Sequence, residues 1–289
     1  MLVDLVQTST RDRFRLDGVF LSPTGPGSSV LPVDAFCFLH GTGGNFYSSS
    51  LFDDLGERLR ELGCGVLRVN TRGHDAVSTA QTEQGGRRQG AAYEVVDHCR
   101  HDIAAWLAWL RQRVGRRVGL LGHSMGAIKC LYALAHEPQD APVCVVAISP
   151  PRLSYSWFCS SPEGADFLQT YQLAERHTTN GQAGTLLDVK LPLSFLITAG
   201  GYLEKYGPEE RYNYLRFAAG VPCPTLVTLG GVESANNMAF RDAPQALEEL
   251  AAKRKNLSVE TIPGADHFYN GVRDVLWSGL ETWLRRMTS

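Results

Sequence analysis

Hydrophobic positions along this chain follow two patterns that alternate through most of the sequence. Short continuous runs are typical of strands buried on both faces, and recurrence every three or four positions is typical of helices with one buried face. The continuous runs predict strands at residues 35–39, 66–70, 117–121, 143–148, 225–229 and 257–262. Two further strands are predicted near the start, at residues 2–9 and 13–22.

Helical spacing lies between these runs. Leucines three and four positions apart predict a helix over residues 51–62, which Gly63 ends. The same spacing predicts helices at residues 95–114, 127–135, 243–253 and 268–286, with Asp242 as the expected cap of the helix at 243–253. Strands that alternate with helices in this way predict an α/β fold, a mostly parallel central sheet with helices on both faces. Ligands of such sheets bind at the carboxyl ends of the strands.

Residues 151–222 interrupt the alternation and are too long for a connection. Residues 166–176 and 208–218 are predicted to be helical, and the segment is dense in aromatic side chains. Because it is inserted between two strands, we expect it to emerge over the carboxyl edge of the sheet as a helical lid. The core would then consist of residues 1–150 and 223–289. The aromatic side chains could form a small core within the lid or line a pocket beneath it.

A second long connection covers residues 74–92 and is rich in Gly and Gln, which indicates a functional or mobile segment. It carries Arg87 and Arg88. These two residues could reach the mouth of a pocket and favour an acidic substrate, or they could belong to a solvated loop.

Composition limits the partners that can be expected. The formal net charge of −2 over 289 residues gives no support for a nucleic-acid partner, and no apolar run approaches the roughly 20 residues of a membrane span. The first residues lack the pattern of a signal peptide. The seven cysteines form no C-x-x-C pair and no metal-ligand spacing. We therefore expect a cytoplasmic protein that needs neither a metal nor a cofactor.

The chemistry centres on Gly122-His123-Ser124-Met125-Gly126, which lies between a predicted strand and a predicted helix. In a G-x-S-x-G turn the serine adopts a strained conformation, and small residues on either side let the strand and the helix approach closely. The turn presents the hydroxyl at the carboxyl edge of the sheet. Ser124 is therefore the candidate nucleophile; the alternative is an incidental serine in a glycine-bracketed turn.

A serine hydroxyl needs an adjacent base, and the base needs a carboxylate that orients it. His267 follows the last strand, so it lies in a loop at the edge where Ser124 emerges, and it is the candidate base. Glu233 is the first carboxylate after the strand at 225–229 and is the candidate acid. Asp242 competes with it, whereas Asp266 adjoins His267 too closely to reach the far ring nitrogen.

Acyl transfer also needs backbone donors for an oxyanion. The N–H of Met125 opens the helix after the nucleophile, and the N–H of Thr42 lies in the glycine-rich stretch His40-Gly41-Thr42-Gly43-Gly44. These two groups are the predicted oxyanion hole. The glycine-rich stretch lacks the pattern and the lysine of a phosphate-binding loop.

With His40-Gly41 after one strand, the Gly122–Gly126 elbow after another, and the chain order Ser124, Glu233, His267, the sequence resembles the α/β-hydrolase-fold serine hydrolases over nearly its whole length. Family members often carry Asp where this chain has Glu233. The segment resembles the lid of capped esterases, and residues 70–75 bear a faint likeness to fungal siderophore-ester hydrolases.

The resemblance implies a serine hydrolase that cleaves a carboxylic ester, or a thioester or amide, of a small-molecule acyl substrate through an acyl-enzyme. Alternatives within the fold are a C–C bond hydrolase and an acyltransferase, which would use the same three residues. A non-catalytic ligand-binding protein of this fold is the alternative from another class. The sequence sets neither the substrate nor the oligomeric state.

Overall fold

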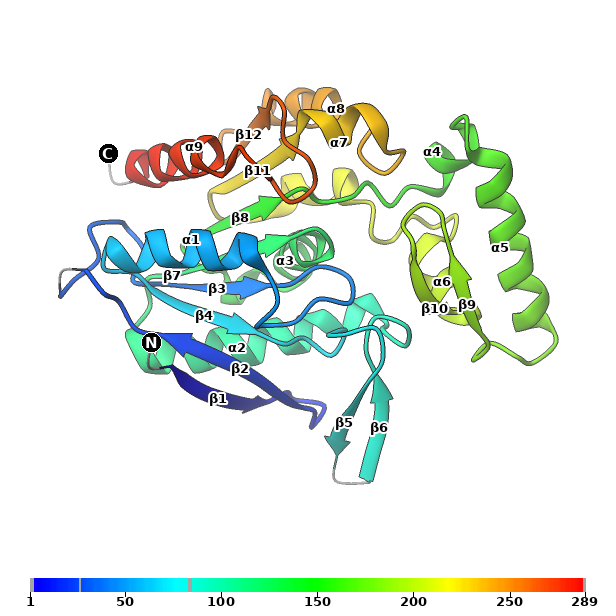
Figure 1. Ribbon diagram of the computed structural model, residues 1–289, viewed down its shortest axis with the longest axis horizontal. Coiled ribbons are helices and arrows are strands. Elements are labelled where there is room, and N and C mark those ends of the chain that lie inside the picture. The colour runs from blue at the N-terminus through cyan, green and yellow to red at the C-terminus, as the bar shows by residue number, and fades with distance from the viewer. Residues whose placement is uncertain (1–2, 26, 83–84, 288–289) are drawn as a thin grey trace.

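The computed structural model describes residues 3–25, 27–82 and 85–287, so Leu2 of the predicted strand 2–9 lies outside the described residues. Eight strands form one central sheet (Figure 1). They are β1 (Asp4–Ser9), β2 (Arg15–Leu21), β3 (Ala35–Leu39), β4 (Gly65–Val69), β7 (Val118–His123), β8 (Cys144–Ile148), β11 (Thr225–Gly230) and β12 (Leu257–Ile262). Their order is β1-β2-β4-β3-β7-β8-β11-β12.

Among the described strands of the central sheet, β2 alone runs in the opposite direction. β2 pairs antiparallel with both β1 and β4, and every other neighbouring pair is parallel. Within β3, Phe36 and Phe38 face one hydrophobic core, while Cys37 and Leu39 face the other. This alternation is the period of two of an extended strand, and it explains why a strand covered on both faces is apolar at every position.

Helices cover both faces of the sheet. α1 (Ser50–Glu61) and α9 (Arg273–Arg286) pack on one face, and α2 (Cys99–Val114), α3 (Met125–His136) and α8 (Ala243–Ala251) pack on the other (Figure 1). The predicted α/β fold, a mostly parallel sheet with helices on both faces, is confirmed.

Several local predictions were wrong. α9 begins at Arg273 rather than at residue 268, and a short helix α7 (Gly231–Asn236) was not predicted. Asp242 precedes α8, but its backbone is left-handed (φ 57°) and its side chain makes no cap hydrogen bond. The predicted helix at 95–114 starts as a 3-10 turn, Val96–His98, before α2.

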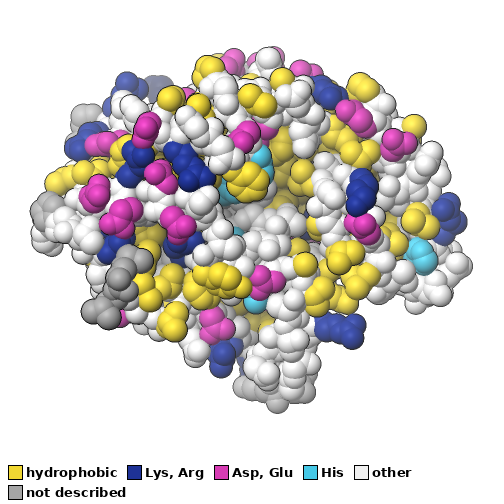
Figure 2. Space-filling model, viewed as in Figure 1, with side chains coloured by type: hydrophobic (Ala, Val, Ile, Leu, Met, Phe, Trp, Pro, Cys, Tyr) yellow, Lys and Arg dark blue, Asp and Glu magenta, His cyan; other side chains and the backbone are white. Residues whose placement is uncertain are grey.

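The segment 151–222 lies between β8 and β11 and projects beside the core (Figure 1). It contains α4 (Tyr155–Ser160), α5 (Gly164–Thr179), the antiparallel pair β9 (Leu186–Val189) and β10 (Phe195–Thr198), and α6 (Ala199–Tyr206). We call this segment the insert. Figure 2 shows a hollow between the insert and the core, with histidine and hydrophobic side chains in its wall.

The structure corrects the prediction for the insert in part. Residues 166–176 lie within α5, as predicted, whereas residues 208–218 form no α-helix; they contain one 3-10 turn, Tyr214–Arg216, and a second, Ala218–Gly220, begins at their last residue. A positive φ of 50° at Glu210 and the Asn213 side chain, which accepts a hydrogen bond from a backbone N–H, both interrupt helical geometry there. The β9–β10 pair was not predicted, and the role of the insert as a lid stays a prediction.

Aromatic side chains of the insert pack mainly on one another. Neighbouring rings in this group have centroids 4.9 to 6.4 Å apart: Phe158, Phe167, Tyr171, Tyr202 and Tyr206. All five are buried. Of the two alternatives that the sequence leaves open, these five rings fit a core within the insert.

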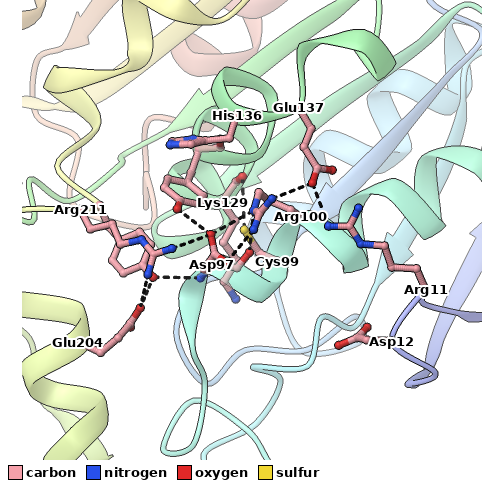
Figure 3. A network of polar contacts seen from close by, with 12 residues as sticks. Arg11, Asp12, Asp97, Cys99, Arg100, Lys129, His136, Glu137, Glu204 and Arg211 are labelled. Carbon is pink, nitrogen blue, oxygen red and sulfur yellow. Dashed lines mark hydrogen bonds and ion pairs between the residues drawn. The ribbon is translucent and has the colours of Figure 1, made fainter.

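A polar network joins the insert to the core (Figure 3). Asp97, just before α2, lies 3.0 Å from the Arg211 guanidinium of the insert and 2.7 Å from that of Arg100. Asp97 also accepts a hydrogen bond of 2.8 Å from the Tyr132 hydroxyl of α3. Burial acts to raise the pKa of Asp97, but the hydrogen bonds from Arg100 and Tyr132 outweigh it and lower the pKa to about 2. The carboxylate is therefore charged at neutral pH and holds the insert electrostatically.

The connection at 74–92 is a hairpin, β5 (Ser78–Thr82) and β6 (Gly85–Gln89), that protrudes from the core in Figure 1; residues 83–84 lie outside the described residues. The Arg87 guanidinium lies 5.5 Å from the centroid of the Phe14 ring. Arg88 is exposed, and its guanidinium lies 3.4 Å from the Tyr93 hydroxyl.

Strand β7 and helix α3 approach each other closely at the turn between them. A Cβ atom at Gly122 would lie 2.3 Å from the carbonyl oxygen of Gly126, and a Cβ at Gly126 would lie 2.1 Å from that of Leu39. Both contacts are with backbone, which cannot rotate away. Hydrogen therefore is the only side chain that fits at these positions.

We expect Gly126→Ala to lower the free energy of unfolding by about 2–3 kcal/mol, because the new methyl group overlaps the backbone at the end of β3. Urea unfolding followed by circular dichroism measures the change. Gly184→Ala is the matched control, because a Cβ there meets no atom within 4 Å. Equal stabilities for the two variants would show that the turn is not closely packed.

Candidate active site

Five parallel strands bring the candidate residues to one edge of the sheet. β3, β7, β8, β11 and β12 are successive neighbours, and each runs in the same direction. The residues after their carboxyl ends therefore converge, as ligand sites of open α/β sheets do. These residues are His40, Ser124, Ser149, Glu233 and His267, in the order of the strands.

Ser124 lies at the turn from β7 to α3 with φ 57° and ψ −124°, a conformation that residues other than glycine rarely adopt. Its backbone N–H donates to the carbonyl oxygen of Ile148 at 2.9 Å, which fixes the turn against the end of β8. The strained geometry predicted from the G-x-S-x-G pattern is present.

His267 and Glu233 are hydrogen-bonded. The distance from His267 Nδ1 to Glu233 Oε2 is 2.6 Å, and the Glu233 side chain is buried. The other carboxylate oxygen of Glu233 accepts hydrogen bonds from the backbone N–H of Gly230, at 2.7 Å, and from the Ser149 hydroxyl. Both oxygens are therefore occupied, so the carboxylate has a fixed orientation toward the imidazole.

The competing carboxylates lie elsewhere. Asp266 accepts hydrogen bonds from Phe268 N at 2.9 Å and from Asn270 N at 3.0 Å. Its carboxylate is therefore engaged within its own turn. Asp242 is exposed at the start of α8.

Ser149 and Tyr269 were missed by sequence reasoning. The Ser149 hydroxyl also contacts the Tyr269 hydroxyl at 3.0 Å, and the Tyr269 hydroxyl contacts Thr228 Oγ1 at 3.0 Å. All three side chains are buried, so this chain of hydroxyls holds the Glu233 carboxylate from behind. The sequence gives one indication, the position of Ser149 directly after a strand. A search for a carboxylate at that position does not consider a serine hydroxyl.

A pocket of about 430 Å³ opens beside Ser124. Ser124 and His267 both line it, and so do Thr42 and the glycines beside it. The insert contributes Leu193 and Ser194 to this pocket. Arg87 and Arg88 are not among its lining residues, so within the described residues this pocket has no arginine of the hairpin.

The backbone of the predicted oxyanion hole lies close to Ser124. A Cβ at Gly41 would lie 2.9 Å from Ser124 Cβ, so the glycine-rich loop passes directly beside the nucleophile candidate. Met125 is the first residue of α3, where the N–H has no partner within the helix. Thr42 lies in the loop that lines the pocket.

No group of three or more His, Cys, Asp or Glu side chains among the described residues could hold a metal ion. In the same part of the chain, no helix is both long and apolar enough to cross a membrane.

Residues 38–276 match the sequence model of the alpha/beta hydrolase family. The chain belongs to this family. No curated protein matches this hydrolase in sequence.

Solved structures resemble this hydrolase over almost its full length. The alpha/beta hydrolase GrgF of Penicillium sp. sh18 has a TM-score of 0.69 at 14% identity, with 100% of each chain covered. Est1E of Butyrivibrio proteoclasticus, with ferulic acid bound, has a TM-score of 0.66 at 16% identity, with 98% of this chain and 99% of that chain covered. An esterase of Pyrococcus furiosus has a TM-score of 0.62 at 17% identity, with 99% and 91% covered. At these identities the likeness shows the fold.

Two further histidines of the hydrolase support the site from below. The His40 ring donates from Nδ1 to the Gly41 carbonyl at 2.8 Å and accepts at Nε2 from the Thr71 N–H at 3.1 Å. The His123 ring donates from Nε2 to the backbone carbonyl of His267 at 2.7 Å. Because its Nε2 accepts a hydrogen bond, the His40 ring is neutral. Each of the two rings fixes a loop that carries a candidate residue.

Burial lowers the pKa of both His40 and His123 to about 3, assisted by the charge of Lys129 for His40 and of His267 for His123. We expect neither ring to titrate between pH 8 and pH 5 in histidine-selective NMR spectra. A ring that protonated near the ordinary pKa of about 6.5 would contradict the buried geometry.

The lowered pKa values of His40 and His123 also make the stability of the protein depend on pH. The folded-state pKa lies below the unfolded one, so below about pH 6.5 the unfolded chain binds protons that the folded chain does not. Each of the two histidines should then lower the free energy of unfolding by about 1.4 kcal/mol per pH unit, down to its own pKa. Urea unfolding at pH 7, 6 and 5 measures this fall, and His123→Asn should reduce its slope.

Proposed function

We propose that this chain is a serine hydrolase that cleaves carboxylic esters through a Ser124–His267–Glu233 triad. The observation that carries the proposal is the hydrogen bond of 2.6 Å between His267 Nδ1 and a buried Glu233, with the His267 side chain lining the same pocket as Ser124. A carboxylate at Nδ1 leaves Nε2 of the neutral ring unprotonated. That nitrogen is then free to take the proton of a serine.

In the first half of the reaction, Ser124 Oγ attacks the ester carbonyl and its proton passes to His267 Nε2. The imidazolium that forms is stabilised by the Glu233 carboxylate, and it returns the proton to the departing alkoxide. In the second half, His267 takes a proton from water, which attacks the acyl-enzyme and releases the acid. Ser124 is regenerated with its proton.

The oxyanion of each tetrahedral intermediate is assigned to the backbone N–H groups of Met125 and Thr42. Their place beside Ser124 supports this assignment, because Met125 opens α3 and Gly41 brings the loop within contact distance of the serine. A preorganised donor of this kind is worth about 3–4 kcal/mol of barrier.

The choice of an ester rests on the family and on the site rather than on a substrate contact. One of the similar structures is named an esterase, and another holds ferulic acid. The insert is assigned the role of a lid, since Leu193 and Ser194 contribute to the pocket.

A fluorophosphonate should form a covalent adduct at Ser124, found by mass spectrometry of the digested protein. Ser124→Ala should remove both the adduct and the hydrolysis of 4-nitrophenyl esters, a loss of about 10⁴–10⁶-fold in kcat. Ser160→Ala, at an exposed serine of α4, is the matched control and should keep both. An adduct elsewhere, or none in folded protein, would refute the proposal.

Ser149→Gly should lower kcat about 10- to 100-fold with little change in KM, because the charged Glu233 loses a hydrogen bond. Glycine is chosen because Ser149 has a φ of 48°, which glycine adopts without strain. Tyr269→Phe should have a smaller effect, since its hydroxyl contacts Ser149 and Thr228. A Ser149→Gly enzyme with the kcat of the wild type would show that the hydroxyl does not position the acid.

A further inference from the structure

A chain of buried polar side chains leads from helix α3 to the glycine-rich loop beside Ser124. The Lys129 ammonium of α3 donates to Thr71 Oγ1 at 3.1 Å, and Thr71 Oγ1 lies 3.2 Å from His40 Nε2. The His40 ring in turn donates from Nδ1 to the Gly41 carbonyl at 2.8 Å. Lys129, Thr71 and His40 are all buried, so these contacts are shielded from bulk water.

The hydrogen bonds of this chain have one consistent direction. An ammonium can only donate, so Thr71 Oγ1 accepts from Lys129 and directs its own proton to His40 Nε2. The Thr71 backbone N–H donates to the same nitrogen at 3.1 Å. Because Nε2 is occupied as an acceptor, the ring proton stays on Nδ1, and the donor to the Gly41 carbonyl is kept in place.

The Gly41 carbonyl and the Thr42 N–H belong to one peptide unit. The carbonyl also accepts from the Gly44 N–H at 3.1 Å, so two donors fix its direction. The peptide is trans, and in a trans peptide the carbonyl and the N–H point in opposite directions. Whatever holds the Gly41 carbonyl therefore also sets the direction of the Thr42 N–H, one of the two donors assigned to the oxyanion.

Lys129 connects this loop to the helix that carries the other donor. Met125 is the first residue of α3, and Lys129 lies about one turn later in the same helix. The contacts from Lys129 through Thr71 to His40 therefore link two donors that come from segments far apart in the chain.

The Lys129 ammonium is itself held by Glu94. The Glu94 carboxylate lies 2.5 Å away, and both side chains are buried. Burial acts to raise the pKa of Glu94, but the charges of Lys129 and Lys205 outweigh it and lower the pKa. A buried ion pair is often no more stabilising than apolar side chains of similar volume. Packing alone does not call for an ammonium here, whereas a directed hydrogen bond to Thr71 does.

We propose that Lys129 and Thr71 are positioning residues of the oxyanion hole, which act through His40 to hold the Thr42 N–H toward the reacting carbonyl. This inference rests on the proposed ester hydrolysis, in which the Thr42 N–H is a donor to the oxyanion. Lys129 and Thr71 are not among the described residues that line the pocket, so they act without touching the substrate.

The kinetic test compares 4-nitrophenyl butyrate with its thionoester, in which sulfur replaces the carbonyl oxygen. Sulfur accepts hydrogen bonds weakly, so a donor to the oxyanion favours the ester. The ratio of kcat for the ester to kcat for the thionoester therefore reports how well the donor is placed. The intrinsic reactivity of the two compounds and the amount of folded enzyme both cancel when this ratio is compared between variants.

Thr71→Val should lower kcat for the ester about 10- to 100-fold with little change in KM, and it should lower the ratio about tenfold, because the Thr42 donor is held less firmly. Thr71→Ser should restore both, since it keeps the hydroxyl. Thr225→Val is the matched control and should keep the wild-type ratio. Thr225 is also buried and donates to the Cys223 carbonyl at 3.0 Å, but it begins β11, at the end of the strand opposite the site. A wild-type ratio in Thr71→Val would overturn the assignment, whatever the change in kcat.

The role of the ammonium is tested with Lys129→Met/Glu94→Gln. Both residues are changed because Lys129→Met alone would leave a buried carboxylate unpaired. The ratio should fall as in Thr71→Val, because the Thr71 hydroxyl loses the donor that directs it toward His40. A double variant with the wild-type ratio would overturn the assignment of Lys129.

A measurement without substrate separates this inference from the proposed reaction. NMR spectra of ¹⁵N-histidine-labelled protein should show the His40 ring protonated at Nδ1. This proton should exchange with solvent about tenfold faster or more in Thr71→Val than in the wild type or in Thr225→Val. If the wild type hydrolyses no ester but this difference is present, the reaction is wrong and the support of the loop through Thr71 stands. If esters are hydrolysed and neither the ratio nor the exchange depends on Thr71, the positioning role is wrong and the reaction stands.

Discussion

The site depends on one close approach, that of strand β7 to helix α3 at the turn of Ser124. The backbone of Ser124 has a φ of 57°, and the flanking glycines leave no room for a side chain. This geometry can persist only because β7 is a central strand, with β3 on one side and β8 on the other, and the hydrogen bond from Ser124 N to Ile148 closes the turn. The surrounding packing thus holds a conformation that the isolated peptide would not adopt.

The polar groups beneath the site follow a second constraint, because a buried polar group must find a partner. Glu233 uses both carboxylate oxygens. The Lys129 ammonium lies 2.5 Å from the Glu94 carboxylate and donates to Thr71 Oγ1 at 3.1 Å, and Thr71 in turn supports His40.

The insert combines a core of its own with attachment to the sheet domain. Its aromatic rings pack together, while the Thr198 N–H donates to the Ala92 carbonyl at 2.9 Å and Arg211 pairs with Asp97 at 3.0 Å. The insert therefore contributes Leu193 and Ser194 to the pocket at the carboxyl edge of the sheet without being part of the sheet itself. The pocket is thus lined both by the segment that carries the nucleophile candidate and by a separate segment of the chain.

The sequence by itself determined the fold and singled out the candidate residues. Continuous apolar runs specify strands buried on both faces, and the glycine-bracketed Ser124 specifies its turn, because both depend on interactions close together in the chain. Chain order also placed His267 and Glu233 after the strands that end at the same edge. Only the tertiary structure decided what supports them, since Ser149, Tyr269 and His123 act through contacts more than 80 residues distant in sequence. It also decided the conformation of the insert, where the positive φ of Glu210 and the hydrogen bond accepted by the Asn213 side chain interrupt the helix predicted for residues 208–218. Contacts such as those of Ser149 and His123 form only when distant parts of the chain are brought together by folding.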